Sequence, residues 1–172
     1  MTQNPPIRRA LLSATALLAA LALAGCSGGG SVRVAAPVTT GSTAEQCAAL
    51  KAALPATLQG RKLRDTTPES ANTAAWGNPA ITLRCGVGTA AVLDPHSPAY
   101  DLNADIEESG GVCWVSEQTA GGGFRFTTVR QQATVELTLP AAYAGGQSPV
   151  GLLAGAVLKA DPVVRDRPFA CV

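Results

Sequence analysis

Histidine and net charge are both scarce in this sequence. One histidine, His96, occurs among 172 residues, and 13 Lys and Arg stand against 12 Asp and Glu. A zinc site built on several histidines, and most acid–base schemes that use histidine, are therefore excluded. The net charge of +1 gives no support to nucleic-acid binding, because nucleic-acid-binding proteins normally carry a strongly basic face.

An apolar run long enough to cross a membrane as a helix is also missing. The most apolar stretch, residues 10–24, has 15 residues, whereas a span needs about 20. It follows Arg8 and Arg9 and ends in small residues. A positively charged start followed by a short apolar run is typical of a secretory signal peptide, which we predict over residues 1–25.

The four residues Leu23-Ala24-Gly25-Cys26 resemble the lipobox of bacterial lipoprotein precursors. In those precursors the cysteine sulfur receives a diacylglyceryl group, and cleavage leaves the lipidated cysteine as the N-terminus. Two acyl chains make membrane anchoring stable. We therefore expect an exported protein anchored through Cys26 to the outer face of the cytoplasmic membrane. The alternative is an ordinary signal peptide whose cysteine is incidental.

Removal of the leader leaves a tether and one domain. Residues 26–42 are rich in Gly, Ser, Thr and Pro, a composition typical of a flexible spacer. The remaining residues, 43–172, suffice for a single domain. The leader holds two basic residues and no acidic one, so the mature chain has 11 basic and 12 acidic residues and a net charge of −1.

The patterning of the domain predicts an α+β fold. One of two overlapping capping boxes, Ser42 with Glu45 or Thr43 with Gln46, starts a helix that must end before Pro55. A second helix starts near residue 149, and its apolar residues Leu152, Leu153, Ala156 and Val157 are expected to face the sheet. Between them, alternation predicts strands near residues 80–85, 101–107, 112–117, 124–129 and 134–139, and residues 61–67 could form a further strand. We expect an antiparallel sheet of about five strands in hairpins, with both helices covering one face.

Besides Cys26, four cysteines remain, which allow two disulfides in three connectivities. Cys47 lies on the apolar face of the first helix, and Cys85 lies on the apolar face of its strand. Cys113 precedes Trp114, so the two side chains point to opposite faces of their strand. The C-terminal tail can cross the face that carries Cys113. We therefore predict the pairs Cys47–Cys85 and Cys113–Cys171.

The block from Trp76-Gly77-Asn78-Pro79 to Arg84-Cys85-Gly86 resembles the signature of a family of exported actinobacterial proteins that carry a domain of unknown function. The resemblance covers roughly residues 43–158. The family usually has an aspartate at the position of Cys113, which implies that Cys113 and Cys171 form an extra pair here. The resemblance implies no activity, because the family has none established.

Candidate functional residues are few. Trp76, Arg84, Arg125 and Arg130 are candidates for a binding surface, because exposed Trp and Arg favour contacts. The competing interpretation places Trp76 in the core, with the arginines covering its edge. The spacing Asp101-x-Asn103-x-Asp105 starts like a calcium loop but lacks its later glycine and glutamate. We predict no metal site, no cofactor and no catalytic residue.

Three functions remain open. The first is a non-catalytic envelope lipoprotein that binds a protein partner or a wall component. The second is a carrier or sensor of a small apolar ligand in a pocket between sheet and helices. The third, a carboxylate-based hydrolase using Asp101, Asp105 and Glu107, has the least support, because alternate carboxylates on one strand are typical of a solvated face.

Overall fold

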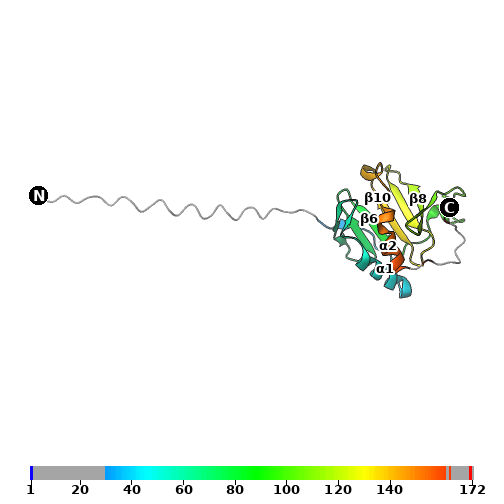
Figure 1. The fold of residues 1–172 in the computed structure, drawn as a ribbon, viewed down its shortest axis with the longest axis horizontal. Helices are drawn as coiled ribbons and strands as arrows, with labels where there is room; N and C mark the ends of the chain where they lie inside the picture. The colour runs from blue at the N-terminus through cyan, green and yellow to red at the C-terminus, as the bar shows by residue number, and fades with distance from the viewer. Residues whose placement is uncertain (2–29, 162, 164–170, 172) are drawn as a thin grey trace.

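The computed structural model describes residue 1, residues 30–161, Val163 and Cys171 (Figure 1). The predicted signal peptide, apart from Met1, and the predicted lipidation site Cys26 lie outside the described residues. Within the described part, no helix is both long enough and apolar enough to cross a membrane.

The core of the domain is one large antiparallel sheet. Its order is β2-β3-β5-β6-β10-β9-β8-β7, and all neighbouring pairs are antiparallel. The strands are β2 (Thr57–Leu58), β3 (Arg61–Arg64), β5 (Thr73–Trp76), β6 (Ile81–Cys85), β7 (Ile106–Ser109), β8 (Val112–Gln118), β9 (Phe124–Thr128) and β10 (Val135–Leu139). The antiparallel sheet is as predicted, but eight strands replace the expected five.

Two hairpin-connected halves build this sheet. One half contains β2, β3, β5 and β6, and the other contains β7 to β10. The pairing of β6 with β10 joins them, with Leu83 opposite Leu137 and Arg84 opposite Glu136. Residues 86–105, which include the short 3-10 helix Ala91–Leu93, connect the halves.

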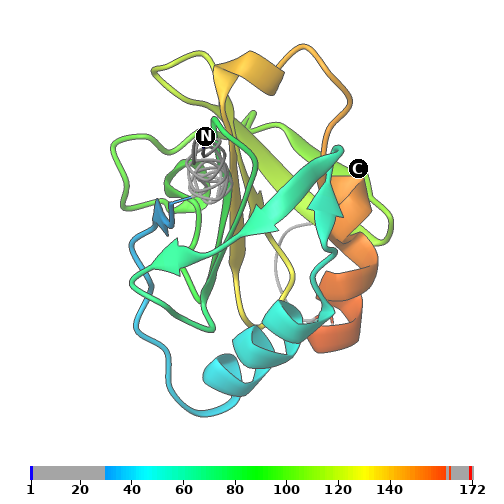
Figure 2. The same cartoon turned by 90° about the vertical axis from the view of Figure 1, so that its left-hand side faces the viewer.

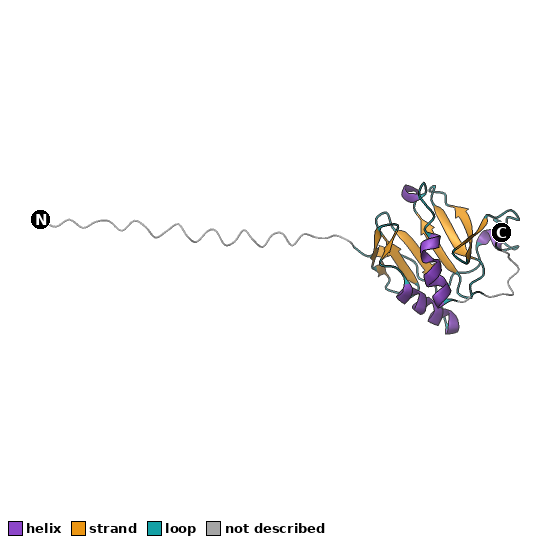
Figure 3. Cartoon of the chain, in the orientation of Figure 1, coloured by secondary structure: helices purple, strands orange, loops and turns teal. Residues whose placement is uncertain are grey.

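Both helices cover one face of the sheet, as predicted (Figures 2 and 3). They are α1 (Gly41–Ala53) and α2 (Val150–Ala160). Leu50 and Leu153 are buried, and they pack with Trp76, Trp114 and the inward side chains of β6 and β10 in one core cluster. The apolar faces of both helices are thus buried against the sheet.

Two details of the helix predictions are wrong. The N-cap of α1 is Thr40, and no side chain caps it with a hydrogen bond. The hydroxyl of Ser42 instead accepts a hydrogen bond from the side-chain amide of Gln132, at 3.1 Å. Leu152, predicted on the buried face of α2, is 61% exposed, whereas its neighbour Leu153 is buried.

The structure forms the two predicted disulfides, Cys47–Cys85 and Cys113–Cys171. In each bond the Cα atoms lie 5.6 Å apart, within the normal range. Trp114 lies in the helix-side core, while Cys113 lies in a smaller cluster on the other face with Leu93 and Val115. The opposite orientation of these two neighbours, which is the basis of the pairing, is therefore confirmed.

The predicted tether is ordered over most of its length. From Gly30 onward it packs on the face opposite the helices, where β1 (Val32–Arg33) pairs in parallel with β4 (Thr66–Thr67). Val34 is buried, and the carbonyl of Pro37 accepts a hydrogen bond from Asn72 at 2.8 Å. The prediction of a flexible spacer over residues 26–42 is thus wrong from Gly30 to Ser42, because β4 and Asn72 offer backbone and side-chain partners.

Two strand predictions also differ from the structure. Residues 101–105, expected as strand, form turns, because the Asp101 carboxylate accepts a hydrogen bond from the Asn103 amide at 2.8 Å. Strand β5 is absent from the strands predicted from the sequence. Ala74 and Ala75 are both fully buried, so β5 is covered on both faces and shows no polar–apolar alternation.

A buried carboxylate ties the end of α2 to the connection between β9 and β10. Asp161 follows α2 and is 1% exposed. Its two oxygens accept hydrogen bonds from the backbone amides of Gln132, at 3.0 Å, and Ala133, at 2.9 Å. These two amides are thus satisfied by one side chain.

Replacement of Asp161 by alanine should lower the free energy of unfolding by about 2–3 kcal/mol, because it leaves buried amides unpaired. Urea denaturation of the purified chain measures this. Glu45→Ala is the control, since Glu45 is an exposed carboxylate on α1, where a surface substitution should change stability by less than about 0.5 kcal/mol. Equal midpoints for the two variants would contradict this role of Asp161.

Candidate functional site

Charged side chains gather on the face of the sheet opposite the helices, which we call the helix-free face. In β6, β10 and β9, alternate residues point to the helix-side core, so the residues between them point the other way. The latter include Arg84, Glu136 and Arg125. The register places Arg84 opposite Glu136, and Arg125 opposite Glu117 of β8.

Glu136 is shared by two arginines. Its Oε1 lies 3.1 Å from a terminal nitrogen of Arg84, and its Oε2 lies 3.6 Å from Nε of Arg125. The Glu136 side chain is 14% exposed, whereas those of Arg84 and Arg125 are 36% and 44% exposed. The carboxylate is therefore held by its neighbours, while both guanidinium groups remain accessible to solvent.

The N-terminal segment contributes to this arrangement. The Nε–H of Arg84 donates to the carbonyl of Ala35 at 3.1 Å. Arg84 is thus fixed from two sides, by Glu136 and by the segment that precedes α1. Because a guanidinium group has five N–H donors in a rigid plane, these two contacts leave donors for a further acceptor.

These groups line a polar pocket of about 360 Å³, which we call the charged pocket. Backbone and small side chains of residues 86–91 form one wall, and Pro37 contributes to another. Its charged residues are Arg84, Glu117, Arg125 and Glu136, so they carry no net charge together. Such a pocket complements a ligand or chain segment that brings polar groups of both signs.

The four residues proposed from sequence for a binding surface do not lie together. Arg84 and Arg125 share the charged pocket, as just described. Trp76 is fully buried in the helix-side core, where its indole N–H donates to the carbonyl of Pro55 at 3.0 Å, so its assignment to a binding surface is wrong. Arg130 follows β9, is half-buried and does not line this pocket.

Sequence reasoning missed Glu117 and Glu136 as site residues. In the strand predicted at residues 134–139, Glu136 alternates with the apolar residues Val135 and Leu137 and therefore points away from the core. What was missing is the pairing of β10 with β6, which brings Glu136 to Arg84 across 52 residues of sequence. Only the long-range register supplies that information.

The carboxylates of the hydrolase hypothesis do not converge. Asp101 lies in a turn, and Asp105 accepts a hydrogen bond from the Ser116 hydroxyl at 3.1 Å. Glu107 pairs with Trp114 in the register of β7 and β8 and lies on the helix side of the sheet. Within the described residues, no group of three or more His, Cys, Asp or Glu is placed to hold a metal ion.

The space between helices and sheet is filled by side chains. Trp76, Trp114 and Leu50 are at most 1% exposed there. The cavity beside Phe124 and Phe126 holds about 200 Å³, which is smaller than the roughly 300 Å³ at the lower end of small-molecule sites. The packed core therefore gives the apolar-carrier hypothesis no specific support. A larger hollow of about 780 Å³ is lined in part by Tyr143 and Leu152, together with the polar side chains of Gln59 and Arg61.

A family model described as "Protein of unknown function (DUF3515)" matches residues 9–164. The chain belongs to this family. No curated protein and no solved structure matches the chain. The resemblance to a family with a domain of unknown function is thereby confirmed. All charged residues of the pocket lie inside the DUF3515 match, and the family description assigns no activity to them.

The Arg84–Glu136 ion pair of the DUF3515 domain should be energetically coupled. A double-mutant cycle with Arg84→Ala and Glu136→Ala should give a coupling free energy of about 0.5–1 kcal/mol, kept small by the exposure of Arg84 and reduced further by salt. Denaturant unfolding at low and high salt measures it. Lys159→Ala with Glu136→Ala is the matched cycle, since Lys159 lies on α2 across the sheet. Equal coupling in both cycles would contradict the ion pair.

Proposed function

We propose that this DUF3515 protein is a membrane-anchored envelope lipoprotein that works as a non-catalytic binding module. Its anchor is a diacylglyceryl group on Cys26 at the outer face of the cytoplasmic membrane, and its binding surface is the charged pocket. The observation that carries the proposal is the cluster in which two solvent-accessible arginines flank the largely buried Glu136.

The charged pocket has the features of a recognition surface. Its arginines are oriented by Glu136 and Ala35 and are therefore partly preorganised, which lowers the conformational entropy lost on binding. Arginine is favoured at binding surfaces because its planar fork donates two parallel hydrogen bonds to one carboxylate. The glutamates offer acceptors for a cationic group beside it.

The same geometry favours binding over catalysis. Both oxygens of Glu136 are engaged by arginines, so this carboxylate already has partners on two sides. Covalent catalysis needs a nucleophile within hydrogen-bond reach of a base. The pocket lining holds Thr89 and Thr127 but no cysteine, serine, lysine or histidine. The residues that line the charged pocket therefore fit a binding role better than a catalytic one.

The partner consistent with this pocket is a protein segment or wall component of the cell envelope. Anchoring would restrict the domain to partners near the membrane surface. A neutral pocket with charges of both signs fits a peptide-like partner that carries a carboxylate and an ammonium or amide group. An apolar partner would leave the charged side chains desolvated and without compensation.

The anchor has a direct test. Cys26→Ser removes the sulfur that would receive the diacylglyceryl group and should move the protein from the membrane fraction to the soluble exported fraction. Fractionation of cells, with mass analysis of the N-terminal peptide, measures this. An unlipidated N-terminal peptide from the wild-type protein would contradict the anchor.

The pocket is tested by site-specific cross-linking in intact cells. A photoreactive amino acid at Thr89, an exposed position in the pocket lining, should yield a discrete adduct, whereas the same group at the exposed Lys159 should not. Adding Glu136→Gln to the Thr89 variant should reduce the adduct about tenfold, since it breaks a charged contact.

The comparison between the two cross-linking positions decides the outcome. Adducts of the same size and yield from Thr89 and Lys159, or a Thr89 adduct unaffected by Glu136→Gln, would contradict the charged pocket as the binding surface. Thermal unfolding of each variant verifies that lost cross-linking does not reflect lost folding.

A further inference from the structure

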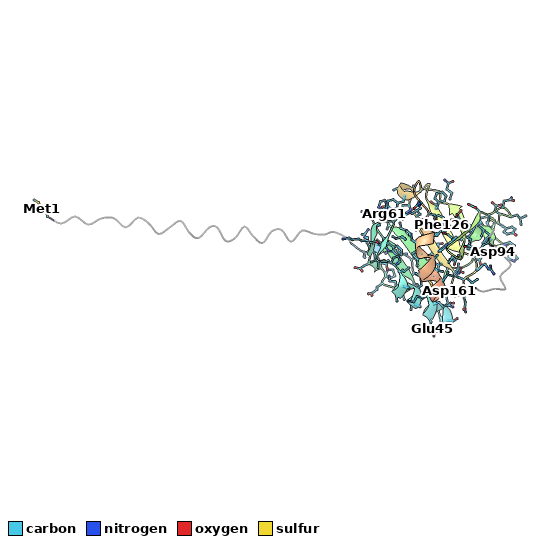
Figure 4. All side chains as sticks on the ribbon, in the orientation of Figure 1. Met1, Glu45, Arg61, Asp94, Phe126 and Asp161 are labelled. Carbon is cyan, nitrogen blue, oxygen red and sulfur yellow. A yellow bond between two sulfur atoms is a disulfide. The ribbon has the colours of Figure 1, made fainter. Side chains whose placement is uncertain are left out.

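Basic side chains gather where the described chain begins. Four of the 13 Lys and Arg lie in β1 and β3: Arg33, Arg61, Lys62 and Arg64. Aspartate and glutamate are absent from both strands, and Asp65 immediately follows β3. Arg33 and Lys62 are exposed. Figure 4 shows Arg61 at this end of the domain. We call these four residues the basic end.

The first residues of the described range 30–161 are fixed to this basic end. Arg64 donates hydrogen bonds to the carbonyl of Gly30 and to that of Gly77, the latter at 2.7 Å. The amide of Val32 donates to the carbonyl of Asp65 at 2.8 Å. The chain therefore leaves the domain beside β3, and the position of Gly30 is set by the fold.

The distance from Gly30 to Cys26 is short. Three residues separate them in the sequence. A fully extended chain advances at most about 3.6 Å per residue, so the Cα atoms of Cys26 and Gly30 lie within about 14 Å of each other. If Cys26 carries acyl chains in the bilayer, the basic end must lie at the level of the lipid headgroups.

We infer that the basic end docks on anionic lipid headgroups, and that it orients the anchored domain on the membrane. This inference rests on the lipidation of Cys26 in the proposed function. Basic residues next to a membrane anchor are attracted to anionic lipids over about one Debye length. The positive charge of the basic end and its short connection to Cys26 therefore indicate the same surface as the one that contacts the membrane.

A connection that lines the charged pocket runs toward the opposite end of the domain. Residues 86–91 form a wall of the pocket, and Asp94 lies three residues beyond them. Figure 4 shows Asp94 at the opposite end of the domain from Arg61. The connection that forms this wall therefore continues toward the end of the domain opposite the basic end, which is the end that would face away from the membrane.

The basic charges also protect a sheet edge. The two-residue strand β2 ends the large sheet and β3 lies next to it, and Lys and Arg at such an edge discourage pairing with another chain. That role requires no lipid. Edge protection alone predicts no change in the accessibility of Lys62 on a membrane, whereas docking predicts its protection, so the two roles are separable by experiment.

Lysine acylation on vesicles tests the docking. The chain has three lysines, of which Lys62 and Lys159 are both exposed, so one serves as an internal control for the other. The lipidated protein is inserted into vesicles of 30% phosphatidylglycerol in phosphatidylcholine. Acylation of Lys62 relative to Lys159 should fall about fivefold compared with the unlipidated Cys26→Ser protein in solution.

Charge-reversal variants of the Cys26→Ser protein test whether the basic end binds anionic lipid when no acyl chains are attached. The Cys26→Ser protein should sediment with phosphatidylglycerol vesicles at low salt and should bind pure phosphatidylcholine vesicles more weakly. Adding Lys62→Glu should weaken sedimentation at least about fivefold, whereas Lys159→Glu, the matched charge reversal, should have a smaller effect.

The acylation and sedimentation experiments together separate the docking of the basic end from the proposed anchoring through Cys26. An unlipidated wild-type Cys26 would contradict the anchor, and sedimentation would still decide whether the basic end binds anionic lipid. An unchanged Lys62 to Lys159 acylation ratio on vesicles, or equal losses from Lys62→Glu and Lys159→Glu, would overturn the docking.

Discussion

The pairing of β6 with β10 is the constraint on which the rest of the structure depends. It is the connection within the sheet between two halves that are otherwise built from neighbouring hairpins. On its helix side, Leu83 and Leu137 belong to the core, and on its other side Arg84 meets Glu136. A slip by one residue would exchange these faces, placing charges in the core and leucines in the pocket. Core and pocket therefore depend on the same register.

Two further connections extend from this pairing. The Cys47–Cys85 disulfide holds α1 at the end of β6, next to the residue pair Val135–Cys85. On the other face, the N-terminal segment supplies the carbonyl of Ala35 to Arg84 and continues back to Gly30 beside the basic end. The segment that would link the domain to its lipid is thus also part of the pocket. Residues 30–37 therefore contact both the basic end and the charged pocket.

Local patterns in the sequence predicted much of the fold and little of the site. Strands such as β6 and β10 are covered by the core on one face only, so their alternation is readable. Strand β5 is covered on both faces, and residues 101–105 alternate but satisfy their polar groups in turns, so both misled the prediction. Arg84 and Glu136 meet only through long-range pairing. The local sequence around Trp76 is compatible with either a buried or an exposed side chain, so it does not predict which one occurs. These outcomes depend on tertiary contacts that local patterns do not encode.

Native-state hydrogen exchange tests the central role of the β6–β10 pairing most directly. If this pairing holds the halves together, its backbone amides should exchange only through global unfolding, with the slowest rates in the domain and the same dependence on denaturant as the unfolding free energy. The account would be contradicted if the amides between β6 and β10 exchanged first, while β2–β6 and β7–β10 remained protected as two independent units.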